Sequence, residues 1–245
     1  MQAPPTAPAP ILPDRAALFL DFDGTLVDIA PRPEAVVIPP ELPPLLLRLA
    51  ARLDGAVAIV SGRSIPDLEA RLGVALAIAG DHGAMLRPAP GAPIERLPLP
   101  VPPAAWVEQL NALSAAFPGT LVEVKAHGFV LHYRLAPEAA SAARGLLETL
   151  LSGSEDFTLM PARMAWEVKP RAISKGTAVA GFMARAPFAG RQPIFIGDDV
   201  TDEAGMAAAR AAGGAGLRLQ DAFGTPAALR AWLSRFAADA AQVPA

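Results

Sequence analysis

Two aspartates, Asp21 and Asp23, follow directly on the apolar run Ala16–Leu20. The run predicts a short buried strand, and Gly24 and Thr25 behind the acids predict a tight turn with free backbone N–H groups. Ionised carboxylates side by side repel one another and lose hydration on burial, so they indicate a positively charged partner. A divalent metal ion is the usual partner. The alternative for this segment alone is a polar strand end followed by a solvated turn.

Two further strand ends carry reactive side chains. The short apolar run at residues 193–196 is followed by Gly197 and then by acids at Asp198, Asp199, Asp202 and Glu203. The apolar run at residues 56–60 is followed by Ser61, Gly62 and Arg63. In an open parallel α/β sheet, ligands bind just outside the carboxyl ends of the strands. The joint pattern therefore predicts one site at this edge of a sheet.

These residues predict phosphoryl transfer. Asp21 is placed to be the nucleophile, because a carboxylate can form an aspartyl-phosphate intermediate. Asp23 is predicted to be the general acid for the leaving oxygen and then the general base for water. Lys175 opens a later helix and can neutralise phosphate charge, and Ser61 with the backbone N–H of Gly62 can bind a phosphate oxygen.

Magnesium is the expected metal ion, because it binds carboxylate or carbonyl oxygens together with phosphate and water. We expect Asp21, Asp23 and Asp198 to hold it. Phosphomonoester hydrolysis needs accelerations of up to about 10²¹-fold, whereas one acid–base group supplies about 10²–10⁴-fold. Nucleophile, metal ion and lysine must therefore all contribute.

The composition is that of a folded protein without a nucleic-acid or membrane signal. The chain has 245 residues, of which 52% are hydrophobic and 18% charged, and its net charge is −3. It has no cysteine, which excludes disulfides, thiolate zinc sites and a cysteine nucleophile. Residues 1–15 are expected to form a flexible tail and not a signal peptide. We expect a monomeric, cytoplasmic protein that acts on a small molecule and binds neither nucleic acid nor a membrane.

Strand and helix patterns alternate at both ends of the chain. Strands are expected at 16–20, 56–60, 74–79, 194–196 and 215–219, and helices at 42–53, 65–72, 177–185, 203–212 and 226–237. This predicts an α/β core with a parallel sheet, made of residues 16–86 and 171–245. Residues 87–170 are expected to form an inserted α+β domain, with helices at 104–117 and 137–152 and strands at 121–125, 129–135, 157–160 and 164–169. A hairpin is expected at 85–99.

The strands expected in the inserted domain carry polar residues at alternate positions, namely Glu123 with Lys125, His132 with Arg134, and Glu167 with Lys169. Because strand side chains alternate between faces, these residues should share one face and apolar residues the other. A face of mixed acids and bases suits the hydroxyls of a sugar, each of which donates and accepts hydrogen bonds. The alternative is a solvated face, which is common in antiparallel sheets.

The chain resembles the haloacid dehalogenase superfamily of phosphatases at Asp21-Phe22-Asp23-Gly24-Thr25, Ser61, Lys175-Gly176 and Gly197-Asp198-Asp199. More narrowly, it is similar to the trehalose-6-phosphate phosphatases. The segments that carry this resemblance are 61–63, 82–83, 122–125, 131–134, 167–171 and 197–203. It implies that the core is Rossmann-like and that the inserted α+β domain is a mobile cap. It also implies Mg²⁺ dependence and hydrolysis of trehalose 6-phosphate to trehalose and phosphate. The substrate-binding residues that it implies are Phe22, Ser61, Gly62, Arg63, Glu123, Lys125, Arg134, Glu167 and Lys169.

Several residues near the expected site have a second interpretation. Asp199 and Asp202 either support the site or cap a helix N-terminus. His82 either supports the site or closes a turn beside Gly83, and Arg63 can pair with a helix acid. Asp81 departs from the family pattern, which is usually apolar there. The alternatives for function are a phosphatase of another sugar phosphate, such as sucrose or glucosylglycerol phosphate, and a catalytically silent sugar-phosphate sensor.

Overall fold

The computed structural model describes residues 12–30, 32–125, 127–162 and 164–239. They divide into two compact units, one made of the chain up to Leu97 and from Ser174 onward, the other of Pro98–Ile173. The fold is mixed α/β with a parallel-strand sheet, which confirms the expected fold class. Among the described residues, no helix is long and apolar enough to cross a membrane.

In the described part of the chain, seven strands form the sheet of the first unit. Their order is β11 (Ala215–Arg218), β10 (Gln192–Gly197), β1 (Ala16–Leu20), β2 (Val57–Val60), β3 (Ala77–Gly80), β4 (Met85–Arg87) and β5 (Glu95–Arg96). The strands from β11 to β3 are parallel to one another, β4 is antiparallel to β3, and β5 is antiparallel to β4. Leu20 at the end of β1 is in register with Ile196 and Ile59. Three strand ends therefore meet at one edge of the sheet.

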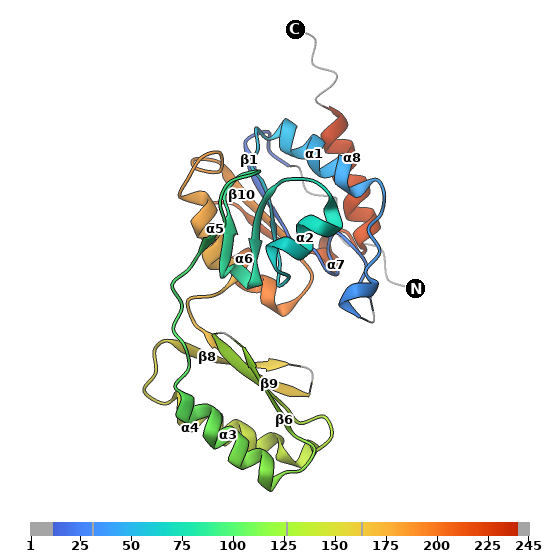
Figure 1. Ribbon diagram of the computed structural model, residues 1–245. Helices are drawn as coiled ribbons and strands as arrows, with labels where there is room; N and C mark the ends of the chain where they lie inside the picture. The colour runs from blue at the N-terminus through green and yellow to red at the C-terminus, as the bar shows by residue number, and fades with distance from the viewer. Residues whose placement is uncertain (1–11, 31, 126, 163, 240–245) are drawn as a thin grey trace. The chain divides into compact units, whose positions relative to one another are not determined.

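The helices of this unit are α1 (Leu42–Arg52), α2 (Ile65–Leu72), α5 (Lys175–Met183), α6 (Glu203–Ala211), α7 (Leu219–Ala222) and α8 (Pro226–Asp239). Figure 1 shows α1 beside α8 on one side of the sheet and α5 beside α6 on the other. Local sequence defines their ends. The Ser64 side chain caps α2, which ends at Gly73 in the left-handed conformation. Ser174 and Thr177 form a reciprocal cap that fixes the first turn of α5.

The second unit is a sheet packed on two helices. Its strands are β6 (Leu121–Lys125), β7 (Gly128–His132), β8 (Phe157–Ala162) and β9 (Ala165–Pro170), in the order β6-β7-β9-β8 and all antiparallel. The helices α3 (Ala104–Ala116) and α4 (Ala140–Leu151) lie together on one face (Figure 1). Phe129, Leu131 and Val168 pack there with Leu110 and Leu147. This confirms the expected alternation of an apolar and a polar face.

Short 3₁₀ turns complete the fold, at Pro33–Ala35, Asp81–Gly83, Pro137–Ala139 and Val200–Asp202. Four details differ from the sequence-based expectations. Residues 87–97, expected in the insert, belong to the first unit, because β4 pairs with β3 and β5 pairs with β4. At the other end of the insert, residues 171–173, expected in the core, belong to the second unit. Leu12, expected in a flexible tail, is buried in the core. Residues 1–11 lie outside the described residues. β7 ends at His132, so Arg134 lies in a turn closed by the Ala136 N–H and the Tyr133 carbonyl.

Candidate active site

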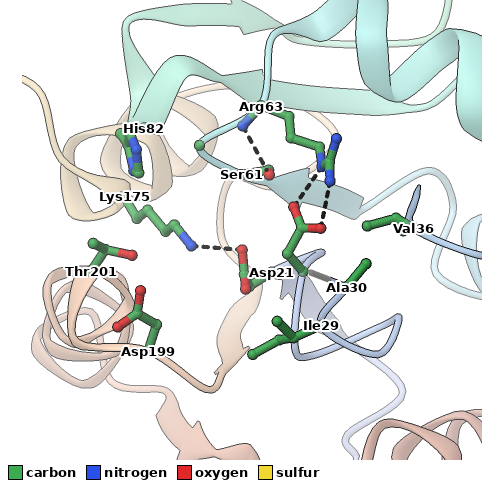
Figure 2. Close-up of a pocket in the computed structure, with 12 residues that line it drawn as sticks. Asp21, Ile29, Ala30, Val36, Ser61, Arg63, His82, Lys175, Asp199 and Thr201 are labelled. Carbon is green, nitrogen blue, oxygen red and sulfur yellow. Dashed lines mark hydrogen bonds and ion pairs between the residues drawn. The ribbon is translucent and has the colours of Figure 1, made fainter. Parts of the chain in front are cut away.

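A pocket of about 370 Å³ opens at the carboxyl edge of the sheet in the first unit. Figure 2 shows Lys175, Asp199 and Thr201 on one side of it and Ile29, Ala30 and Val36 on the other. Its lining residues are Asp21, Asp23, Ile29, Ala30, Val36, Ser61, Gly62, Arg63, His82, Lys175, Asp199 and Thr201. The structure thus brings together most of the residues that the sequence predicted for the core site.

Lys175 is the buried cation of this pocket. It stands at the first residue of α5, and its Nζ lies 2.6 Å from Asp21 Oδ1 and 2.6 Å from Asp202 Oδ1 (Figure 2 shows the Asp21 contact). The side chains of Lys175 and Asp202 are 3% and 0% exposed. A buried ammonium is stable only with charged partners, so the two carboxylates account for its position.

Asp202 also shapes the turn after β10. Its Oδ2 accepts hydrogen bonds from the backbone N–H groups of Asp198 and Asp199, at 3.1 and 3.0 Å. Asp199 in turn accepts from the Val200 N–H and caps the short 3₁₀ turn. Asp202 thus accepts backbone hydrogen bonds at the start of the 3₁₀ turn and contacts Lys175, while its side chain makes no cap hydrogen bond at the start of α6. For Asp199 the structure provides the cap and a place in the pocket lining.

Asp198 lies next to the end of β1. Thr25 Oγ1 donates to Asp198 Oδ1 at 2.9 Å and lies 3.3 Å from Asp21 Oδ2. Gly24 has a φ of +83°, and a Cβ there would overlap the Asp198 carboxylate, so only glycine permits this approach. Carboxylate oxygens of Asp21, Asp198 and Asp202 all lie within 4.8 Å of one another.

Burial governs the charges of this cluster. Burial raises the pKa of Asp21 to about 7, although the Lys175 charge opposes the change. Burial also raises the pKa of Asp198. For Lys175, burial alone would lower the pKa, but the charges of Asp21 and Asp202 outweigh it and raise the pKa. A further positive charge between the carboxylates would relieve this cost.

Asp23 is held on the other side of the pocket by Arg63. The Arg63 Nε and Nη2 atoms donate to the two oxygens of Asp23 at 2.6 and 2.8 Å. The Arg63 Nη1 atom donates to Asp67 of α2 at 2.8 Å, so the predicted pairing with a helix acid occurs. Asp23, predicted as a metal ligand, directs its carboxylate to Arg63 and lies outside the cluster of Asp21, Asp198 and Asp202.

The side chain of Phe22, which the sequence predicted to be a substrate-binding residue, is fully buried in the core. It lies between Asp21 and Asp23, which both line the pocket. Its ring lies 5.7 Å from the Arg63 guanidinium carbon. Any contact of Phe22 with a ligand would therefore have to use its backbone.

The turn after β2 packs against His82. A Cβ on Gly62 would lie 2.6 Å from the His82 ring, so Gly62 allows this close approach. The His82 N–H donates to the Ser61 carbonyl at 3.0 Å, and His82 has a φ of +56°. Ser61 Oγ accepts from the Arg63 N–H at 3.2 Å. His82 thus closes a turn and also lines the pocket.

The polar residues of the second unit pair with one another. Lys125 Nζ lies 2.8 Å from Glu167 Oε1, and His132 Nε2 lies 2.9 Å from Glu123 Oε2. The register of β6, β7 and β9 places Glu123 and Glu167 on either side of Val130, on one face. Lys169, two residues along β9 from Glu167, shares that face. Arg134 is exposed in its turn and takes no part in the strand pairing.

The sequence did not reveal three side chains that donate hydrogen bonds to backbone carbonyls beside the site. Arg218 and Gln220, beside the end of β11, both donate to the Asp198 carbonyl, at 3.4 and 3.3 Å. Arg230 of α8 donates to the Leu26 carbonyl at 2.8 Å, in the turn after the two pocket aspartates. No local pattern marks these residues, because each reaches a segment far away in the chain.

Solved structures define the class of fold. A trehalose-6-phosphate phosphatase of Aspergillus fumigatus superposes with a TM-score of 0.71 at 22% identity, covering 95% of this chain and all of the other. A haloacid dehalogenase-like hydrolase from B. subtilis superposes with a TM-score of 0.55 at 15% identity, covering 78% of this chain and 86% of the other. The fold is therefore that of the haloacid dehalogenase-like hydrolases.

Sequence comparison narrows the class. The trehalose-phosphatase family model matches residues 19–217. The trehalose-6-phosphate phosphatase of Escherichia coli (strain K12) is 39% identical over 93% of this chain and 85% of its own length. A probable trehalose-phosphate phosphatase of Sinorhizobium fredii is also 39% identical, over 84% of this chain and 78% of its own length. The chain belongs to the trehalose-phosphatase family and is a phosphatase.

Proposed function

We propose that this protein hydrolyses trehalose 6-phosphate to trehalose and phosphate through a phosphorylated Asp21. The observation that carries the proposal is the 2.6 Å contact of Lys175 with Asp21 in the pocket. A buried carboxylate beside an ammonium is suited to attack an anionic phosphate, because the ammonium offsets the charge of the incoming group. The substrate comes from the names of the two relatives at 39% identity.

The proposed reaction has two steps. An Asp21 oxygen forms a bond to phosphorus while the bond from phosphorus to the sugar oxygen breaks, and that oxygen takes a proton from Asp23. Water then attacks the aspartyl phosphate, Asp23 takes the proton, and the phosphorus bond to Asp21 breaks to release phosphate. Lys175, Ser61 and the Gly62 N–H are proposed to bind the phosphate oxygens.

The donor set fits Mg²⁺. Asp21, Asp198 and Asp202 supply closely spaced carboxylate oxygens, which are the ligands that Mg²⁺ prefers. Asp202 already contacts Lys175 and two backbone N–H groups, so we propose Asp21 and Asp198 as the carboxylate ligands. Asp23 would then contribute through its backbone carbonyl. When bound, the ion would neutralise charge on the phosphate.

We propose that the polar face of the second unit recognises the sugar. Glu123, Lys125, Glu167 and Lys169 offer both donors and acceptors, which is what vicinal hydroxyls require. Arg134 is kept in this proposal as an exposed cation beside the sheet. The ion pair of Lys125 with Glu167 and the hydrogen bond of His132 with Glu123 hold these side chains in place before a sugar arrives. Monomeric state and cytoplasmic location stay expectations from the sequence.

The test is phosphate release from trehalose 6-phosphate, sucrose 6-phosphate and glucose 6-phosphate, each with Mg²⁺ and with EDTA. We expect Mg²⁺-dependent turnover that is fastest on trehalose 6-phosphate. Asp21→Asn should abolish it, and Asp54→Asn is the matched control. Asp54 is exposed, pairs with Arg191 and has a φ of +51°, which asparagine adopts easily. Equal rates of phosphate release from all three sugar phosphates would refute the substrate assignment. Absence of turnover on all three would favour a catalytically silent sugar-phosphate sensor.

A further inference from the structure

A row of alternating charges runs from the pocket into helix α2. Arg63 bridges Asp23 and Asp67, and Arg71 Nε donates to both oxygens of Asp67 at 2.9 Å. Asp67 thus accepts hydrogen bonds from Arg63 on one side and Arg71, one helical turn further on, on the other. Asp67 lines no part of the pocket described above.

The geometry fixes the Arg63 guanidinium from two directions. Its Nε–Nη2 edge faces Asp23 and its Nη1 atom faces Asp67, while the Phe22 ring lies 5.7 Å from its central carbon. The Arg63 side chain is 11% exposed. Because the guanidinium is planar and its N–H donors point in fixed directions, contacts with two carboxylates restrict its orientation more than one contact does. Asp67 therefore selects the orientation in which both oxygens of Asp23 are bound.

Helix α2 makes Asp67 a rigid support. Its own N–H donates to Ser64 Oγ, the N-cap of the helix, and it lies in the first turn, where a carboxylate is favoured by the helix dipole. Its contacts with Arg71 and Arg63 lower its pKa, so it stays charged when Asp23 exchanges a proton. A partly buried support of this kind positions a functional side chain more closely than a loop does.

We propose that Asp67 is a positioning residue of this phosphatase, which holds Arg63 and through it sets the place of the Asp23 carboxylate. This rests on the proposed role of Asp23 as the acid and base of the reaction. Without Asp67, the Arg63 guanidinium loses its second anchor and can turn with Asp23 away from the leaving oxygen. Proton transfer to that oxygen would then be slower.

The dependence of kcat/KM on the leaving group distinguishes a positioning role of Asp67 from a structural one. Loss of structure alone would lower kcat/KM equally for all leaving groups. p-Nitrophenolate is a stable anion and needs little protonation as it departs, whereas a sugar alkoxide or phenolate needs much more. Phenyl and p-nitrophenyl phosphate are close in size, so differences between them report chemistry and not fit. The ratio kcat/KM covers the steps up to the departure of the alcohol.

The experiment compares kcat/KM of the wild type, Asp67→Asn and Glu69→Gln on trehalose 6-phosphate, phenyl phosphate and p-nitrophenyl phosphate. Glu69 is the matched control, because it is a carboxylate on the same helix that pairs with Arg87. We expect Asp67→Asn to lower kcat/KM about 10-fold or more on trehalose 6-phosphate and phenyl phosphate. On p-nitrophenyl phosphate the decrease in kcat/KM should be less than about 3-fold. Glu69→Gln should change none of the three by more than about 2-fold.

Equal losses on all three phosphates, or no loss, would overturn the positioning role while leaving the proposed function intact. Turnover retained by Asp21→Asn would instead overturn the proposed function.

A second measurement guards against a folding defect. In an Arg63→Lys background, where one ammonium cannot hold both carboxylates in the same way, Asp67→Asn should add no further leaving-group selectivity. Full additivity of the two substitutions would also contradict the proposal.

Discussion

Lys175 and Asp21, which are 154 positions apart in the chain, meet at 2.6 Å between Nζ and Oδ1. Asp21 follows β1, Lys175 opens α5, and the whole second unit, Pro98–Ile173, lies between them in the sequence. The insertion therefore separates the two halves of one buried ion pair. The first unit must bring both segments together for this pair to form.

Removing the buried cation should be costly for stability. Lys175→Met would leave Asp21 and Asp202 buried without their ammonium, and breaking such a pair costs about 3–5 kcal/mol. The loss should be smaller at pH 5 than at pH 8, because the stranded carboxylates can take up protons. Urea unfolding at the two pH values measures it. The control Lys125→Met removes an exposed partner of Glu167 and should cost less than about 1 kcal/mol. Equal losses in both variants would be inconsistent with this account.

Asp21→Asn should change how the metal-free protein responds to pH. The pKa of Asp21 is raised to about 7 by burial, so between about pH 4 and about pH 7 the folded state holds a proton that the unfolded state has released. The contribution of Asp21 to wild-type stability therefore falls as pH rises through this window. Asparagine cannot ionise, so the Tm of Asp21→Asn should rise relative to the wild-type Tm across this window. The difference between the two Tm values should stay constant at higher pH. Each kcal/mol corresponds to about 2–4 °C in a chain of this size.

Thermal unfolding in EDTA from pH 4 to 8 checks this prediction. Asp54→Asn serves again as the exposed control and should follow the wild-type curve. A Tm difference between Asp21→Asn and the wild type that shows no change with pH would mean that the Asp21 carboxyl titrates in its ordinary range.

Asp198→Asn should weaken metal binding more than it weakens the fold. The substitution removes a half-buried carboxylate but keeps an oxygen that can accept from Thr25. We expect the Mg²⁺ concentration for half-maximal activity to rise about 10-fold or more, as happens when metal sites lose a supporting group. The Mg²⁺-induced rise in Tm should shrink in parallel. Asp14→Asn, exposed and paired with Arg52, is the control. An unchanged Mg²⁺ requirement would remove Asp198 from the proposed metal site.

If the second unit recognises the sugar, substitution of Glu167 should weaken the binding of sugar substrates only. Glu167→Gln should raise KM for trehalose 6-phosphate about 10-fold, because a charged hydrogen bond contributes about 1.5–3 kcal/mol. Its kcat/KM on p-nitrophenyl phosphate should stay unchanged. Glu148→Gln, an exposed acid of α4 paired with Arg144, is the matched control. Steady-state kinetics on both substrates measure the effect, and a parallel loss on p-nitrophenyl phosphate would argue against sugar contact.

Much of the local structure was predictable from neighbouring residues. The helix expected at 65–72 is α2, and the strand expected at 121–125 is β6. Apolar periodicity, a serine cap and a following glycine act over a few positions, so they can be read along the chain. The gathering of Asp21, Ser61 and Lys175 followed from a general property of parallel sheets, whose strand ends share one edge.

Other features depended on which surfaces pack together. The hairpin of β4 and β5 extends the core sheet because β3 offers an unpaired edge, which no signal within residues 85–99 shows. Arg134 lies beyond the end of β7 because strand pairing stops at His132. Arg218 and Gln220 reach Asp198 only because β11 is placed beside β10.

By itself, the sequence determined the class of fold and the acids, serine and lysine available for phosphoryl transfer, since both depend on residue type and short spacing. Only the tertiary structure decided how these charges are shared. It paired Asp23 with Arg63 and Lys175 with Asp21 and Asp202, and it buried Phe22. The physical reason is that a charge inside a protein is stabilised by whichever opposite charge packing brings within hydrogen-bond distance, and that partner can come from any part of the chain.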